Sequence, residues 1–233
     1  MIQVRKSTER GDANHGWLKS KHTFSFGEYY DENHIGFGAL RVINEDRIDG
    51  GTGFGTHGHR DMEIISYVVE GAIEHRDSMG TDSIIKPGEV QRMSAGTGIR
   101  HSEYNHSKDK TTHFLQIWIV PSKVGMAPSY DQKSFANDFL SGDLILVASF
   151  AGRNGSVTIN QDVDMYAAKV LEAGEKILKT SKHRKFWIQV IKGEVSAEKT
   201  VLKAGDGAGI SGVDSLNMKW NKESEFILFD LPE

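Results

Sequence analysis

Short apolar segments that alternate with polar residues recur along the whole chain, and glycine-bearing turns separate them. Each segment is at most ten residues long, which is typical of half-buried strands rather than amphipathic helices. Long amphipathic helical patterns are missing. The segments are HTFSFGEYY, FGALRVI, MEIISYVVEG, HFLQIWIV, LILVASF, SVTINQDV, KFWIQVIKG and EFILFDL. The pattern therefore predicts an all-β protein with few short helices.

A polar, turn-rich stretch divides these segments near the middle of the chain. The sequence PSKVGMAPSYDQKSFAND at 121–138 lies between two strongly apolar segments and is typical of a linker. A chain of 233 residues is long enough for two domains of ordinary size. We predict an N-terminal domain of residues 1–125 and a C-terminal domain of residues 126–233.

The two halves share a short internal similarity. The segment YVVEGAIEHRD followed by IIKPGEVQRM is similar to QVIKGEVSAEK followed by VLKAGDGAGI. In this comparison Gly71 and Gly88 match Gly193 and Gly205. Each copy predicts a strand, a turn at glycine, a pair of strands and a second turn. Two similar antiparallel β-barrels in tandem are the simplest arrangement that accounts for it.

The composition of the chain bears on its partners, its possible ligands and its compartment. The 28 Lys and Arg residues against 32 Asp and Glu give a net charge of −4, so we expect no direct nucleic-acid partner. The chain has no cysteine, which excludes disulfides and thiolate ligands and suits a reducing compartment. The aliphatic run LILVA at 144–148 is too short to cross a bilayer, and the N-terminal sequence has no signal-peptide core. We expect a cytoplasmic protein without a membrane partner.

Two histidines stand one residue apart in GFGTHGHRDMEI, directly before an apolar segment. In a strand, residues i and i+2 share a face at a spacing of about 6.6 Å, so His57 and His59 point the same way. His101 and Glu103 form a second pair with this period in SAGTGIRHSEYN. A barrel that brings both pairs face to face would collect three imidazoles and one carboxylate. This set suits one divalent transition metal per chain, among Fe(II), Ni(II), Co(II), Mn(II), Cu(II) and Zn(II).

A second carboxylate competes with Glu103 for the fourth ligand position. Glu63 follows His59 by four residues, and this even spacing keeps both on one face if the strand is unbroken. We favour Glu103, because its i+2 relation to His101 is the shortest. Glu63 is then a supporting residue or a strand residue turned elsewhere. Seven other histidines are assigned to surface or hydrogen-bonded positions: His15, His22, His34, His75, His106, His113 and His183. Two of these, His22 and His113, stand in alternating segments and could face inward.

Together these motifs resemble the cupin superfamily and, within it, the pirin family. The order GFGTHGHRDMEI, VVEGAIEHRDSMG, MSAGTGIRHSEYN is similar to the metal-binding cupin pattern. The segments NHGWLKSKHTFSFGEYYD and GFGALRVINEDRI resemble the N-terminal signature of pirins, especially bacterial pirin-like quercetin 2,3-dioxygenases. The resemblance implies a bicupin of two jelly-roll barrels with one metal, normally Fe(II), in the N-terminal barrel. The pirin ligands correspond to His57, His59, His101 and Glu103.

The second copy lacks these ligand types. When the two copies are aligned on their glycines, Lys179 and Ser181 stand in place of the two histidines of the first pair. Met218 and Trp220 take the places of the second pair. We therefore predict that the C-terminal barrel binds no metal.

The resemblance implies an enzyme, a metal-dependent oxidoreductase that cleaves a flavonol such as quercetin with dioxygen. Glu103 would be the carboxylate at the metal, and it is the candidate catalytic general base for the flavonol hydroxyl. The alternative is a pirin-type regulatory module, whose metal shapes a surface for a protein partner without physiological catalysis. A non-oxidative cupin isomerase uses the same fold but fits the continuous pirin signature less well.

Overall fold

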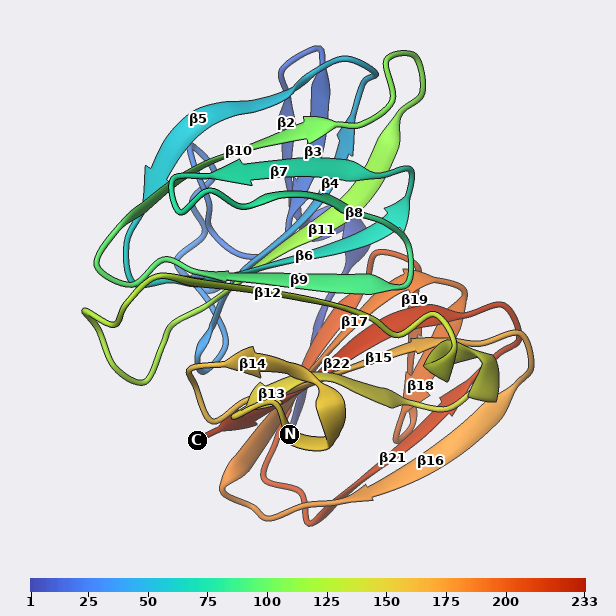
Figure 1. Cartoon of the computed structure of the whole chain (residues 1–233). Coiled ribbons are helices and arrows are strands. Elements are labelled where there is room, and N and C mark those ends of the chain that lie inside the picture. The colour runs from blue at the N-terminus through green and yellow to red at the C-terminus, as the bar shows by residue number, and fades with distance from the viewer.

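The computed structural model describes residues 1–233 and consists of 22 strands and three short 3-10 helices. The strands form two seven-stranded and two four-stranded sheets. One sheet of each size forms an N-terminal barrel, and the other two form a C-terminal barrel, seen as the upper and lower lobes in Figure 1. The predicted all-β fold of two tandem barrels is confirmed. No helix of the structure has the length and apolarity needed to cross a membrane.

The N-terminal barrel pairs a large sheet with the small sheet that carries the predicted ligands. The large sheet runs in the order β12 (Ser129–Ser134), β9 (Glu89–Ser94), β6 (Glu63–Glu70), β11 (Thr112–Ile119), β4 (Leu40–Ile48), β3 (Leu18–His22), β2 (Gly11–Asn14). The small sheet runs in the order β5 (Gly53–His59), β10 (Ile99–Asn105), β7 (Ile73–Asp77), β8 (Asp82–Ile85). All neighbouring strands in both sheets are antiparallel.

The C-terminal barrel repeats this plan. Its large sheet runs in the order β1 (Ile2–Arg5), β20 (Gly207–Ser211), β17 (Arg184–Lys192), β22 (Glu225–Pro232), β15 (Asp164–Lys169), β13 (Ile145–Phe150), β14 (Val157–Ile159). Its small sheet runs in the order β16 (Gly174–Lys179), β21 (Ser215–Trp220), β18 (Glu194–Ala197), β19 (Thr200–Lys203). The helices are η1 (Ser7–Glu9), η2 (Asp138–Ser141) and η3 (Arg153–Gly155). The pair β13 and β14 is parallel.

Two glycines show how closely the barrels correspond. Gly71 follows β6 with φ +84°, and Gly193 follows β17 with φ +76°. A Cβ atom at Gly71 would collide with Thr112, and one at Gly193 would collide with Ser224. Positive φ and close approach both require glycine. The internal sequence similarity therefore reflects the same steric requirement at the same turn of two barrels.

Each half of the chain contributes one strand to the barrel of the other half. The first strand, β1, pairs with β20 of the C-terminal barrel, from Ile2 opposite Ile210 to Arg5 opposite Gly207. In the segment predicted as a linker, β12 pairs with β9 of the N-terminal barrel. The pattern did not predict β12, because this edge strand has no alternating apolar side chains to mark it. The boundary between residues 125 and 126 stays a prediction.

The buried apolar residues are divided unequally among the two barrels and the contact between them. The largest core contains 23 buried residues from both barrels, including Ile117 and Phe229, and lies where the two large sheets meet. A core of 16 buried apolar residues fills the C-terminal barrel, and it includes Met218 and Trp220, which replace the second ligand pair. Within the N-terminal barrel the apolar clusters have only six and four buried members. Buried polar side chains occupy much of the remaining interior, which makes this barrel the place for a polar site.

Candidate metal centre

Strands β5 and β10 are hydrogen-bonded neighbours, and their register brings the predicted histidines together. His57 stands opposite His101, and His59 stands opposite Ile99. The register then shifts at a bulge, so that Phe54 stands opposite Glu103. One ring nitrogen of each of His57, His59 and His101 lies within 4.8 Å of the other two. The i, i+2 periodicity and the strand pairing thus place three imidazoles around one point.

Hydrogen bonds identify the nitrogen that His57 presents. Its Nδ1 lies 2.8 Å from the carbonyl oxygen of Gly55, which can only accept, so Nδ1 carries a proton and Nε2 is the nitrogen available to a metal. This Nε2 lies 3.1 Å from Nε2 of His101. Two ligands at about 2.1 Å from one cation and at a right angle are about 3 Å apart. The two imidazoles therefore fit a first-row transition metal.

The protonation of the other two imidazoles also fits a metal. Burial, with the neighbouring imidazoles of His101 and His57, lowers the pKa of His59 to about 4. Burial, with the imidazoles of His57 and His75, lowers the pKa of His101 to about 3. Both rings are therefore neutral at physiological pH. Neutral imidazole is the form that binds a metal.

Glu103 lies beside this cluster, on the inner side of β10, with an exposed fraction of 2 %. Its carboxylate accepts hydrogen bonds from Ser66 Oγ at 2.9 Å and Gln116 Nε2 at 3.4 Å. It forms a second group of potential ligands with His101 and His75. The structure therefore brings Glu103 next to His101 but groups it apart from the pair on β5.

Glu63, the competing carboxylate, has a different position. The strand does not continue past His59, because β5 ends there and Asp61 turns the chain with φ +62°. The carboxylate of Glu63 is fully buried and accepts hydrogen bonds from Ser94 Oγ and from the backbone and side-chain nitrogens of Asn160. Glu63 joins no group of potential ligands. It helps to hold the two barrels together.

Sequence reasoning missed the role of His75. It was assigned to the surface or to a hydrogen-bonded boundary, but it is fully buried on β7, and its Nδ1 lies 3.5 Å from Nδ1 of His101. β7 pairs with β10, with Asp77 opposite His101 and His75 opposite Glu103. The missed signal is that His75 and Asp77 repeat the i, i+2 spacing of the two ligand pairs.

The two histidines that could face inward, His22 and His113, lie outside the metal cluster. His22 has an exposed fraction of 6 % and packs edge-on against Phe26, with ring centroids 5.3 Å apart. Nε2 of His113 lies within hydrogen-bond distance of Oε1 of Glu45, at 2.9 Å. Both therefore have packing or hydrogen-bonding roles in the barrel.

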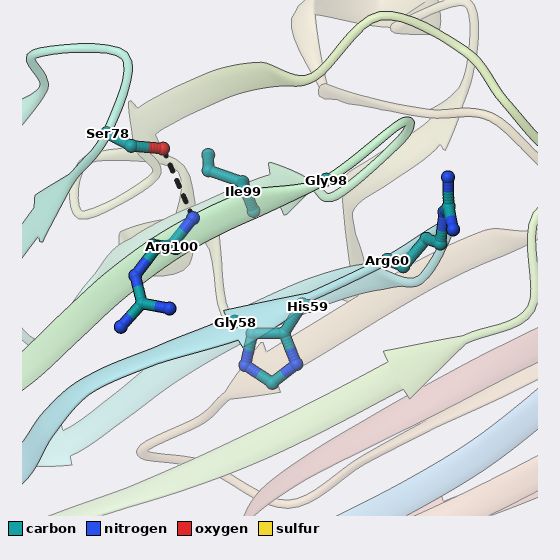
Figure 2. A pocket seen from close by; sticks show the side chains of 7 residues that line it. All are labelled: Gly58, His59, Arg60, Ser78, Gly98, Ile99 and Arg100. Carbon is teal, nitrogen blue, oxygen red and sulfur yellow. Dashed lines mark hydrogen bonds between the residues drawn. The ribbon is translucent and has the colours of Figure 1, made fainter.

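The rim of the barrel beside His59 is hollowed. A hollow of about 410 Å³ is lined by Gly58, His59, Arg60, Ser78, Gly98, Ile99 and Arg100. In Figure 2 the guanidinium groups of Arg60 and Arg100 extend away from each other, so they do not converge on one ligand. Trp118 packs edge-on against His59 with ring centroids 5.0 Å apart, and Phe26 packs against Trp118 at 5.4 Å. An aromatic wall therefore adjoins the imidazole cluster.

A buried carboxyl, Asp46 on β4, accepts a hydrogen bond from Ser20 Oγ inside the same barrel. Burial raises the pKa of Asp46 to about 7, and the charges of Glu103 and Glu45 add to the rise. Ser20 and Arg10 oppose the rise without cancelling it. The folded protein therefore holds this proton at pH values where the unfolded chain has lost it.

Replacing Asp46 with Asn should remove a loss of folding stability that depends on pH. Below about pH 4 both states are protonated, but between about pH 4 and 7 the unfolded state releases the proton and the folded state does not. The wild type then loses stability relative to the variant by about 1.4 kcal/mol per pH unit, on the order of a few kcal/mol in total. Urea unfolding of both metal-free proteins from pH 4 to 8 measures this. A stability difference that is independent of pH would contradict it.

The fold and the site define a bicupin with a metal centre of imidazoles in its first barrel. The sequence model of the pirin family matches residues 2–119, and that of the quercetinase C-terminal cupin domain matches residues 146–231. The chain belongs to the pirin family.

Relatives of known name cover the whole chain. It is 47% identical to quercetin 2,3-dioxygenase of Escherichia coli K12, over 100% of this chain and 99% of that protein. It is 42% identical to a pirin-like protein of Caulobacter vibrioides, over 99% of each. The structure of the Escherichia coli bacterial pirin YhhW in complex with nickel(II) matches with a TM-score of 0.94 and 47% identity, covering 100% of this chain and 99% of that chain.

Proposed function

We propose that this protein is a metal-dependent dioxygenase that cleaves a flavonol such as quercetin with dioxygen. The observation that carries the proposal is the convergence of three imidazoles, two of them held neutral by burial, beside the carboxylate of Glu103. The 47% identity to the Escherichia coli quercetin 2,3-dioxygenase supports the substrate class.

We infer that His57, His59 and His101 hold the metal and that Glu103 is the fourth ligand. A set of imidazoles and one carboxylate suits Fe(II), which is the metal we expect. Ni(II), Co(II), Mn(II), Cu(II) and Zn(II) suit the same donors, and the similar YhhW structure is a nickel(II) complex. When bound, the metal supplies Lewis acidity for the enol-type oxygen of the substrate and supports its reaction with dioxygen.

Glu103 is the residue to which we assign proton transfer. Its carboxylate is fixed by the hydroxyl of Ser66 and the amide of Gln116, which come from β6 and β11 of the opposite sheet. A fixed carboxylate beside the imidazoles is placed to accept the proton of the flavonol hydroxyl. Loss of that proton gives the electron-rich substrate anion that the reaction requires.

The aromatic wall supports a planar aromatic substrate. Trp118 packs edge-on against His59, and Phe26 packs edge-on against Trp118. Aromatic rings attract one another in stacked and edge-on arrangements. The indole N–H of Trp118 is buried without a hydrogen-bond partner. A buried donor without a partner favours a ligand that brings an oxygen to it.

The other expected partners follow from composition. A net charge of −4 gives no basic field for nucleic acid, and the absence of cysteine suits the cytoplasm. We expect the protein to act there on a small aromatic substrate and dioxygen, without a membrane partner.

The experiment that tests this function is metal analysis combined with oxygen uptake. Protein purified without a histidine tag should contain one transition-metal ion per chain, because the second barrel has no equivalent ligands. It should consume dioxygen with quercetin, and chelation of the metal should stop the reaction until Fe(II) is restored. Two ions per chain would contradict the single site. Metal-loaded protein that leaves a range of flavonols untouched would instead favour a regulatory module with a protein partner.

A further inference from the structure

A buried chain of three side chains leads away from the metal centre. His75 Nδ1 lies 3.5 Å from His101 Nδ1, and His75 Nε2 lies 3.1 Å from an oxygen of Asp77. The side chains of His75 and Asp77 are both fully buried. His75 also packs against Tyr130, with ring centroids 5.0 Å apart. The order Asp77, His75, His101 therefore connects a carboxylate to a candidate metal ligand. We call this hydrogen-bonded series the relay.

Hydrogen bonds to Asp77 determine which ring nitrogen of His75 carries a proton. The Oδ1 atom of Asp77 accepts backbone N–H groups of Met79 at 2.9 Å and Thr81 at 3.1 Å, and Oδ2 faces His75. Burial alone would raise the pKa of Asp77, but the hydrogen bonds from His75, Thr81 and Met79 outweigh it and lower the pKa. An ionised carboxylate can only accept, so His75 must donate from Nε2.

The position of the ring proton on His101 depends on its two nitrogen neighbours. Because Nε2 of His75 donates to Asp77, Nδ1 of His75 is the nitrogen left to accept from Nδ1 of His101. When Nε2 of His101 binds a metal, the one N–H proton of this ring stands on Nδ1, and Nδ1 of His75 is its hydrogen-bond acceptor. That Nε2 is the atom that lies 3.1 Å from Nε2 of His57.

We propose that Asp77 and His75 are positioning residues for the metal centre, because their hydrogen bonds hold His101 in the tautomer that presents Nε2 to the metal. The inference rests on the proposed metal site. His57 achieves the same result with the backbone carbonyl of Gly55, whereas His101 depends on two side chains. The tautomer of His101 can therefore be changed by substitution at positions outside the ligand set.

The same residues permit a competing arrangement, a second cation held by His75, His101 and Glu103. With a metal also on Nε2 of His101, this arrangement would require His101 to lose its one N–H proton and become an imidazolate. It would also place the inner cation on the nitrogens that the relay uses for its hydrogen bond. The relay needs no such deprotonation, and we therefore favour it.

Asp77→Asn tests the relay with almost no change of shape. The two backbone N–H groups should keep the amide oxygen in the place of Oδ1, so that the NH₂ group faces His75. His75 would then accept at Nε2 and donate from Nδ1, and His101 would be driven to carry its proton on Nε2. We expect the affinity for Ni(II) to fall by roughly 10- to 100-fold, the usual effect of losing such a supporting residue.

The direct readout is the tautomer of His75 in the metal-free protein at pH 7.5, from ¹⁵N chemical shifts of the histidine rings. The wild type should show His75 protonated on Nε2, where it donates to Asp77, and Asp77→Asn should shift that proton to Nδ1. Asp82→Asn is the matched control, because Asp82 lies on the neighbouring strand and its side chain is 66% exposed. His75→Phe removes the acceptor for His101 and should also weaken Ni(II) binding, which keeps the test valid if Asp77→Asn does not fold.

Three results would overturn the relay. The first is a His75 tautomer that is unchanged in Asp77→Asn. The second is Ni(II) affinity equal to that of Asp82→Asn in both Asp77→Asn and His75→Phe. The third is binding of two ions per wild-type chain with Nδ1 of His75 as a ligand. Failure of the proposed function is distinguishable, because the tautomer and Ni(II) affinity are measured without any flavonol.

Discussion

Alanine in place of His59 is expected to abolish metal retention and leave a folded β protein. His59 supplies one of three converging imidazoles, and no other histidine joins that group. Loss of a ligand itself should exceed the roughly 10- to 100-fold loss of affinity caused by removing a supporting residue. Stability should change little, because 23 apolar residues are buried between the barrels and 16 inside the second barrel, away from the imidazoles.

Elemental analysis gives the metal content of His59→Ala, and circular dichroism reports whether the β fold remains. His15→Ala is the matched control, because His15 is exposed and lies outside the metal cluster. Wholesale unfolding of His59→Ala would make the metal structural and remove the main support for an enzyme. Full metal retention would take His59 out of the ligand set.

Exchange of Glu103 for Gln should separate metal binding from turnover. Gln keeps the size of the side chain and an oxygen that can face the metal and accept from Ser66, but it lacks the basicity to take the flavonol proton. We expect the variant to keep most of its metal and to lose quercetin turnover by roughly two orders of magnitude or more, a typical contribution of general base catalysis. The measurement is the loss of quercetin absorbance under air, with metal content determined on the same sample.

Glu74→Gln is the matched control for this substitution. Glu74 lies on β7, next to the strand of Glu103, and its partly exposed side chain pairs with His106 at the surface. The control should turn over quercetin at the wild-type rate. If Glu103→Gln were as active as the wild type, Glu103 would lose its role as base while the metal ligands and the dioxygenase function would stand.

The sequence by itself determined the strands and which residues share a strand face. Alternation has a period of two residues and depends on the local backbone, so the pairs His57/His59 and His101/Glu103 could be recognised without knowing their neighbours. The matching glycines likewise predicted two similar barrels, because positive φ at a tight turn is a local requirement.

The tertiary structure alone decided which faces meet. The i, i+2 spacing of His75 and Asp77 is visible in the sequence, but only the pairing of β7 with β10 places His75 beside His101. The turn at Asp61 directs Glu63 towards Asn160, which the spacing from His59 did not reveal. Strand pairing joins residues far apart in the chain through register and barrel closure. Local periodicity fixes the face of each strand, and it contains no information about the strand that will lie next to it.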